Sequence, residues 1–143
     1  MKNQSPTTGS VSESLSSLQQ LVSNLVNNFL STASQNNTQL VNEVRQEIAL
    51  GATPNKAIEV IRELLETVIA NSSNGVIHIT AERLGSTILL QIQERNNNNG
   101  YALAYSIGTI EPTALSAGGH ISINGPQKRV ATISFSFPDQ LVA

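Results

Sequence analysis

The chain has 143 residues, of which 39% are hydrophobic and only 3% aromatic, and it contains no cysteine. Eight lysines and arginines against ten acidic residues give a net charge of −2, without the basic surface that nucleic-acid binding requires. The lack of cysteine excludes disulfides and thiolate metal sites, and no apolar run approaches the roughly 20 residues that cross a bilayer. We therefore expect a soluble, cytoplasmic protein that binds neither nucleic acid nor a membrane.

The beginning of the chain predicts a tail followed by a helix. Residues 1–9 have no hydrophobic periodicity and are expected to be disordered. Ser10 and Glu13 have the spacing of a capping box, which predicts an N-terminal helix over residues 10–34. Its apolar stripe consists of Leu15, Leu18, Val22, Leu25, Val26 and Phe29. The stripe could be covered by the rest of the chain or by a second copy, which would make a homodimer through this helix.

Residues 35–143 are predicted to form one domain. The pattern between Thr38 and Leu50 is weak, and we favour a short strand there. Thr53 followed by Pro54 predicts the start of a helix, with the threonine as its N-cap. A clear helical stripe follows, made of Ile58, Ile61, Leu65, Val68 and Ile69.

After this helix the apolar period changes to two, which predicts an antiparallel hairpin over residues 76–92 with a turn at 84–86. Residues 101–110 are expected to form a short helix that Pro112 stops. A second hairpin is predicted over residues 121–137. Helices on one face of a mixed, mostly antiparallel sheet make a two-layer α/β sandwich of the α+β class.

Two segments resemble the ATP-binding domain of sensor histidine kinases, whose fold is shared with gyrase and a heat-shock chaperone. Residues 63–72, followed by 75–79, resemble the asparagine-box helix of this family as it leads into the sheet. Residues 117–123, followed by 131–138, are similar to its Gly-Gly hairpin. The likeness covers about residues 38–138.

The resemblance implies that particular positions would hold a nucleotide. The magnesium-binding asparagine of the family aligns with Thr67, whose hydroxyl is a poorer ligand, and Asn71 lies one turn later. The adenine-binding aspartate aligns with Glu94, but Arg95 and Asn96 stand where the family has glycine. We expect this Glu-Arg pair to be exposed surface at a strand end.

Other parts of the family's chemistry are reduced in this sequence. The glycine-rich lid corresponds to residues 96–100, in which Gly100 is the one glycine that remains of two. The predicted helix over residues 10–34 has no acceptor histidine, and His78 and His120 are expected to be ordinary sheet or surface residues. Asp139 is the only aspartate and is expected to lie in the tail after the last strand.

These observations favour a non-catalytic signalling module that binds a protein partner, acts as a scaffold and needs no cofactor. In this interpretation, a degenerate histidine-kinase-like ATPase domain has kept its framework and lost most of its nucleotide site. The alternative is a divergent protein kinase or ATPase domain of a two-component system. It would bind ATP and magnesium through Thr67, Asn71, Glu94 and Gly100.

Overall fold

The structure, a computed structural model, describes residues 16–96, 100–125 and 129–139. The helices of these residues are α2 (Leu18–Gln35), α3 (Asn55–Ala70), α4 (Gly100–Gly108) and α5 (Glu111–Ser116). Two short strands, β1 (Ser16–Ser17) and β3 (Ala49–Leu50), pair with each other. The main sheet consists of β2 (Gln39–Asn42), β4 (Val76–Leu84), β5 (Thr87–Arg95), β6 (His120–Asn124) and β7 (Val130–Pro138).

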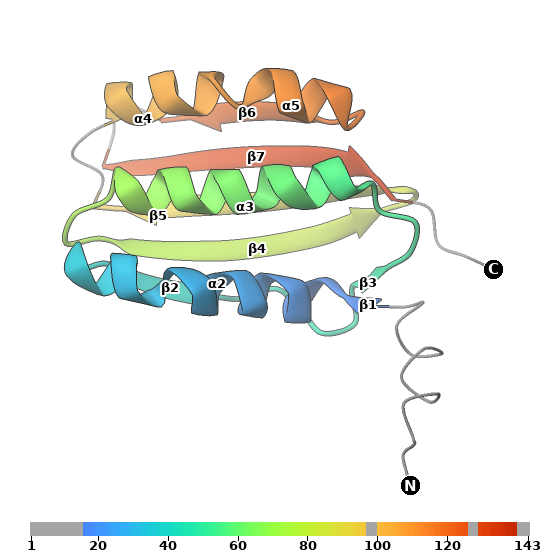
Figure 1. Ribbon diagram of the computed structural model, residues 1–143, viewed down its shortest axis with the longest axis horizontal. Helices are drawn as coiled ribbons and strands as arrows, with labels where there is room; N and C mark the ends of the chain where they lie inside the picture. The colour runs from blue at the N-terminus through green and yellow to red at the C-terminus, as the bar shows by residue number, and fades with distance from the viewer. Residues whose placement is uncertain (1–15, 97–99, 126–128, 140–143) are drawn as a thin grey trace, which may run out of the picture.

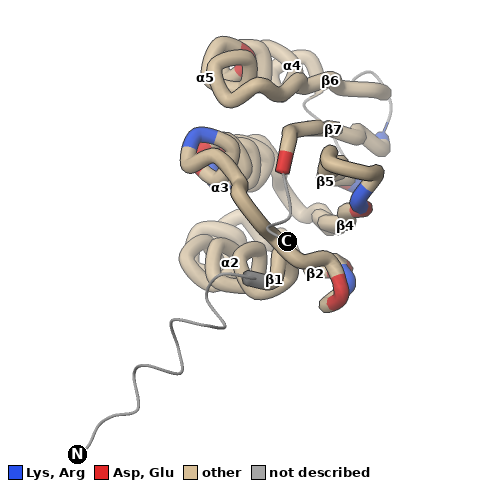
Figure 2. The backbone as a smooth tube through the Cα atoms, turned by 90° about the vertical axis from the view of Figure 1, so that its right-hand side faces the viewer, with Lys and Arg blue, Asp and Glu red and all other residues tan. Residues whose placement is uncertain are grey.

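The main sheet has the strand order β2-β4-β5-β7-β6. Strand β2 runs parallel to β4, and the other pairs are antiparallel. The helices lie on one side of the strands (Figure 1), and Figure 2 shows the two layers end-on. The predicted α+β sandwich is therefore confirmed. No helix in the described part of the chain is long and apolar enough to span a membrane.

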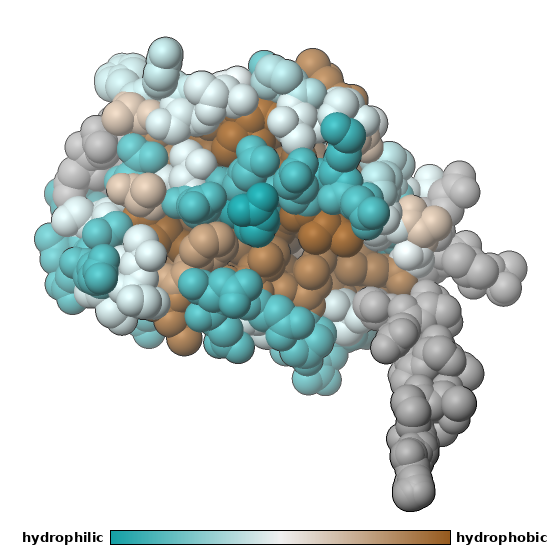
Figure 3. Space-filling model, viewed as in Figure 1, coloured by the Kyte–Doolittle hydropathy of each residue, from teal (hydrophilic) through white to brown (hydrophobic). Residues whose placement is uncertain are grey.

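A single core lies between the helices and the sheet. On β5, alternate residues face this core, because successive side chains of a strand point to opposite faces. Phe135 and Phe137 are also buried, with ring centroids 5.0 Å apart. Figure 3 shows polar side chains along the outer surface of α3 and apolar ones between α3 and α2. Burial of each large aliphatic side chain contributes roughly 1.5–3 kcal/mol.

Helix α2 belongs to this core. Leu18 and Val22 have no exposed surface, and Leu25 is only 7% exposed. The helix begins at Leu18, later than predicted, because the two preceding residues are in β1 and the Ser17 hydroxyl caps the helix by accepting from the Gln20 amide. The predicted tail and capping box lie outside the described residues. Among the described residues of the stripe, Leu18, Val22 and Leu25 are thus covered by the chain itself, and Val26 and Phe29 are partly buried against the core.

Two predicted helix boundaries are wrong, each for a local reason. Thr53 does not cap α3, because its hydroxyl donates to the Asp139 carboxylate instead, and Pro54 occupies the N-cap position. Pro112 does not stop a helix but lies in the first turn of α5, where its missing N–H costs no helical hydrogen bond. The helix predicted over residues 101–110 corresponds to α4, and α5 follows it.

The Gly-Gly pair before β6 meets two different requirements. Gly118 has a φ of +78°, which favours glycine. Gly119 lies against β7, and a Cβ atom there would be 2.5 Å from the carbonyl oxygen of Ser136 and 2.7 Å from the ring of Phe135. Glycine is therefore favoured at 118 by the backbone conformation and required at 119 by the close approach to β7.

An ion pair joins the end of β7 to strand β4. Asp139, predicted to lie in a tail, is fully buried and pairs with Arg83 of β4. Its carboxylate also accepts from the Gly51 amide at 3.0 Å and from Thr53, while Arg83 donates to the Ala49 carbonyl at 2.7 Å. This network joins β3, β4 and the end of β7.

Candidate functional site

A buried polar cluster, made of Thr38, Ser72 and Glu94, lies where α2, α3 and β5 end and β4 begins. The three residues are 7%, 3% and 1% exposed, respectively. The Thr38 hydroxyl donates to the Ser72 hydroxyl oxygen at 3.1 Å, and Ser72 is hydrogen-bonded to the Glu94 carboxylate. The cluster therefore connects the ends of the two long helices to the end of β5.

Glu94 reaches this position because it continues the inward-facing series of β5, after Ile88, Leu90 and Ile92. Our expectation of an exposed strand-end residue was wrong, since Glu94 pairs between Ile77 on β4 and Ala131 on β7 in the middle of the sheet. Burial raises the pKa of the Glu94 carboxyl, and the Ser72 hydrogen bond offsets part of this shift. Its Oε1 atom has no hydrogen-bond partner among the described residues.

Gly75 allows the cluster to pack closely. A Cβ atom at Gly75 would lie 2.9 Å from both the Ser72 hydroxyl oxygen and the Arg95 carbonyl oxygen, and 3.8 Å from Oε2 of Glu94. Thr38 and Gly75 also line a hollow of about 490 Å³ beside the end of α2 and β2. The cluster thus lies just beneath this hollow.

The other predicted ligands, Thr67 and Asn71, lie at the end of α3. Asn71 follows the last residue of the helix, and its side-chain amide donates to the Thr67 carbonyl oxygen at 2.9 Å. The amide of Asn36 similarly donates to the Ile69 carbonyl oxygen at 2.8 Å. These side chains add a second donor to carbonyl groups in the last turn of the helix, which also accept from the Asn71 and Ser72 backbone amides. The described residues contain no group of three or more His, Asp and Glu side chains placed to hold a metal.

Gly100 is the first residue of α4. Because β5 ends at Arg95, the connection between the two elements is only four residues, 96–99. Asn96 has a φ of +67°, a conformation that asparagine tolerates better than most residues. The remainder of the predicted lid, residues 97–99, lies outside the described residues.

Both histidines lie on strands of the sheet. His78 lies on β4 and His120 begins β6, as expected for ordinary sheet residues. The Nδ1 atom of His78 is 2.8 Å from Oε1 of Glu43. This carboxylate is 35 residues away along the chain, so no local pattern predicts the contact.

No protein-family model matches the chain, and no curated protein matches it either. Solved structures of histidine kinases do match the chain. The catalytic domain of the histidine kinase ThkA has a TM-score of 0.69 and 14% identity, over 87% of this chain and 94% of that one. The Acinetobacter baumannii histidine kinase AdeS has a TM-score of 0.70 and 12% identity, over 88% of this chain and 66% of that one. The chain has the histidine-kinase ATPase fold.

Two further structures place this fold in longer proteins. Full-length ShkA, in complex with AMPPNP, has a TM-score of 0.72 and 12% identity, over 91% of this chain and 32% of that one. ThkA in complex with the response regulator TrrA has a TM-score of 0.63 and 16% identity, over 88% and 41%. The chain thus spans about a third of ShkA. The predicted resemblance is confirmed for the fold.

Proposed function

We propose that this chain is a non-catalytic interaction or scaffold module of a signalling system, built on the histidine-kinase ATPase fold. The observation that carries the proposal is the burial of Glu94, which is 1% exposed at the position that aligns with the adenine-binding aspartate. A carboxylate with so little exposed surface cannot accept a hydrogen bond from a ligand unless the surrounding side chains move. It works instead as part of the polar cluster within the fold.

The residues at the end of α3 also argue against a magnesium site. Thr67 offers a hydroxyl, and the hydrogen bond from the Asn71 side-chain amide to the Thr67 carbonyl holds the Asn71 side chain at the end of the helix. Magnesium is usually bound in proteins through one or two carboxylates together with substrate phosphates. This pair supplies no carboxylate, and a threonine replaces the asparagine of the family at the aligned position, so it fits a magnesium ion bound to a triphosphate poorly.

The short connection after β5 supports the same conclusion. Backbone amides of a flexible, glycine-rich segment can surround phosphate groups, because glycine permits close approach. Here four residues, all asparagines, join Arg95 to Gly100. Four residues span at most about 14 Å when fully extended, and they must already bridge the strand and the helix.

A protein partner is the expected ligand of such a module. ThkA, which shares the fold, has been solved in complex with its response regulator TrrA. We propose that this chain likewise binds a signalling protein in the cytoplasm. Because its own core covers the α2 stripe, homodimer formation through this helix is not part of the proposal.

One observation favours the alternative of a divergent ATP-binding domain. Oε1 of Glu94 has no donor among the described residues, and the amino group of an adenine would supply one. The hollow beside Thr38 and Gly75 lies next to this cluster. In this alternative Thr67, Asn71 and Gly100 would hold magnesium and phosphate.

Calorimetric titration of the full chain with ATP and magnesium tests the proposal. We expect no binding tighter than roughly 100 μM, which corresponds to about 5.5 kcal/mol. The proposal is wrong if ATP binds more tightly than this and the Glu94→Ala variant abolishes the binding. A matched variant, Glu59→Ala on the exposed face of α3, separates loss of a ligand from a general loss of charge.

A further inference from the structure

The outer edge of β6 is open to pairing. In the described sheet β6 is the last strand, and its pairing with β7 is continuous from His120 to Asn124, without a bulge. Natural edge strands usually avoid further pairing through lysine, proline, bulges or inward-pointing charges. Strand β6, with the sequence His-Ile-Ser-Ile-Asn, has none of these. Its free N–H and C=O groups are therefore a template for one more strand.

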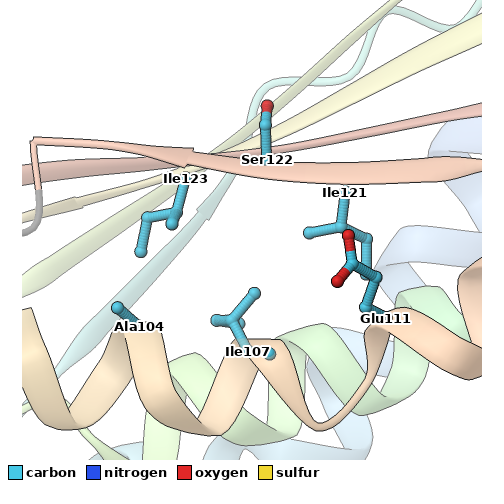
Figure 4. A pocket seen from close by; sticks show the side chains of 7 residues that line it. Ala104, Ile107, Glu111, Ile121, Ser122 and Ile123 are labelled. Carbon is cyan, nitrogen blue, oxygen red and sulfur yellow. The ribbon is translucent and has the colours of Figure 1, made fainter.

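A pocket of about 140 Å³ lies beside this edge, between β6 and the helices α4 and α5. Figure 4 shows Ile121 and Ile123 pointing from the strand toward the helices, with Ala104 and Ile107 facing them. Ala104 and Gly108 are small, and a Cβ atom at Gly108 would meet no atom within 4 Å. The helix therefore leaves room for an additional apolar side chain.

One charged group lies in this otherwise apolar pocket. The carboxylate of Glu111 points toward β6 beside Ile121 (Figure 4). No hydrogen bond or ion pair of Glu111 occurs among the described residues, and it is the only charged side chain lining the pocket. A strand placed next to β6 would present alternate side chains to the helices. One of these would lie near Ile123 and the next near Glu111.

We propose that this groove binds an extended segment of a partner protein, which adds to β6 as a further strand. The segment carries an apolar side chain and, two positions away, a lysine or arginine that pairs with Glu111. The inference rests on the proposed interaction function and names its surface. Peptide-binding domains that extend a sheet at its edge use main-chain hydrogen bonds for affinity and pockets for alternate side chains for specificity.

A second copy of β6 fits the groove less well. Its inward-facing residues are Ile121 and Ile123, so self-pairing would place an isoleucine, not a cation, against Glu111. The helices that border the groove also expose large side chains: Tyr101 is 77%, Tyr105 80% and Leu115 60% exposed. Tyrosine is enriched where proteins bind one another. These features favour a different protein as the occupant.

The test uses the full chain and fluorescein-labelled peptides in which threonine alternates with isoleucine. One peptide has lysine at a central isoleucine position, and a second has glutamate there. We expect the lysine peptide to bind, with fluorescence anisotropy giving an affinity at least roughly fivefold higher than for the glutamate peptide. The Glu111→Lys variant should reverse this preference, whereas the matched Glu59→Lys variant on α3 should not. Ala104→Phe, which fills the pocket, should abolish binding.

Backbone methylation distinguishes strand addition from other binding. In a strand with one partner, only alternate N–H groups face that partner. Of two lysine peptides that are N-methylated at opposite alternate positions, one should therefore lose binding and the other keep it. The proposal is overturned if no peptide binds or if both methylated peptides bind equally. It is also overturned if Glu111→Lys leaves the preference for the lysine peptide unchanged, or if light scattering shows a dimer that Ala104→Phe dissociates. If the peptides do not bind and the chain does not bind ATP either, only the proposed peptide groove is wrong. If the chain binds ATP, the proposed function itself is wrong.

Discussion

The side-chain amide of Asn71 donates a hydrogen bond to the carbonyl oxygen of Thr67, 2.9 Å away, at the end of α3. The side chain of Asn71, which with Thr67 is a candidate magnesium ligand in the ATP-binding alternative, is therefore engaged with the backbone of its own helix. Nearby, Ser72 and Thr38 are hydrogen-bonded to each other, and Ser72 is hydrogen-bonded to the buried carboxylate of Glu94. Polar groups at this end of the sheet thus stabilise the junction between helices and strands.

The buried carboxylate of Glu94 makes stability depend on pH. Burial raises its pKa above the ordinary value, so the folded chain binds this proton more tightly than the unfolded chain. The stability from this group is fully present below the unfolded-state pKa and is lost as pH rises through the folded-state pKa. Urea unfolding should therefore show Glu94→Gln gaining stability relative to the unmodified chain as pH rises above the ordinary pKa of a glutamate. A stability difference between the two chains that is constant with pH would contradict this.

The ion pair between Arg83 and Asp139 should contribute strongly to stability. Asp139 has no exposed surface, and the Asp139→Ala variant would leave Arg83, Thr53 and the Gly51 amide without their acceptor. We expect the free energy of unfolding to fall by about 3 kcal/mol. The exposed pair of Arg45 and Glu47 provides the control, since Arg45→Ala should cost less than about 1 kcal/mol. Equal effects of the two variants would show that Asp139 is not part of a buried network.

The turn before β6 should not tolerate a side chain at its second glycine. In Gly119→Ala the new methyl group would overlap the Ser136 carbonyl and the Phe135 ring, which we expect to cost about 1–3 kcal/mol. Gly108→Ala is the matched control, because nothing lies within 4 Å of its Cβ position. Thermal unfolding should show a clear decrease in Tm for the first variant only. Equal unfolding temperatures of the two variants would contradict the close contact of Gly119 with β7.

Helix α2 should stabilise the domain through its core-facing residues. Leu18 is fully buried, so Leu18→Ala should lower the free energy of unfolding by about 2–5 kcal/mol. Leu30, on the same helix, is 48% exposed and should cost much less when replaced by alanine. Light scattering should give the same mass for both variants as for the unmodified chain. A change in mass for Leu18→Ala, without loss of stability, would instead indicate that α2 pairs with a second copy.

Elements whose apolar period is unambiguous could be predicted from the sequence. The alternation of Ile77 and Ile79, and of Ile88, Leu90 and Ile92, predicted the first hairpin, and the 3.6-residue period predicted α3. The same alternation also places Glu94 on the core face. A charged residue near a strand end is usually exposed, but the register of β5 places this one among the buried side chains.

The errors arose where the partner is distant along the chain. The hydroxyl of Thr53 binds Asp139, 86 residues later, and no local signal could have distinguished this contact from helix capping. Thr38 and Ser72, 34 residues apart, meet only because α2 and α3 end at the same side of the sheet. Glu111 and β6 border one groove for a similar reason, since only the folded topology brings helix and edge strand together.

The most direct test of the central claim is an NMR titration of the ¹⁵N-labelled chain with ADP and magnesium. The account predicts that the amide signals of Glu94, Ser72 and Asn71 do not shift at millimolar ADP, because Ser72 already binds Glu94 and the Asn71 side chain already binds the Thr67 carbonyl. Saturable shifts of these signals, absent in Glu94→Ala, would show that the chain binds a nucleotide at this end of the sheet. That result would contradict a non-catalytic role.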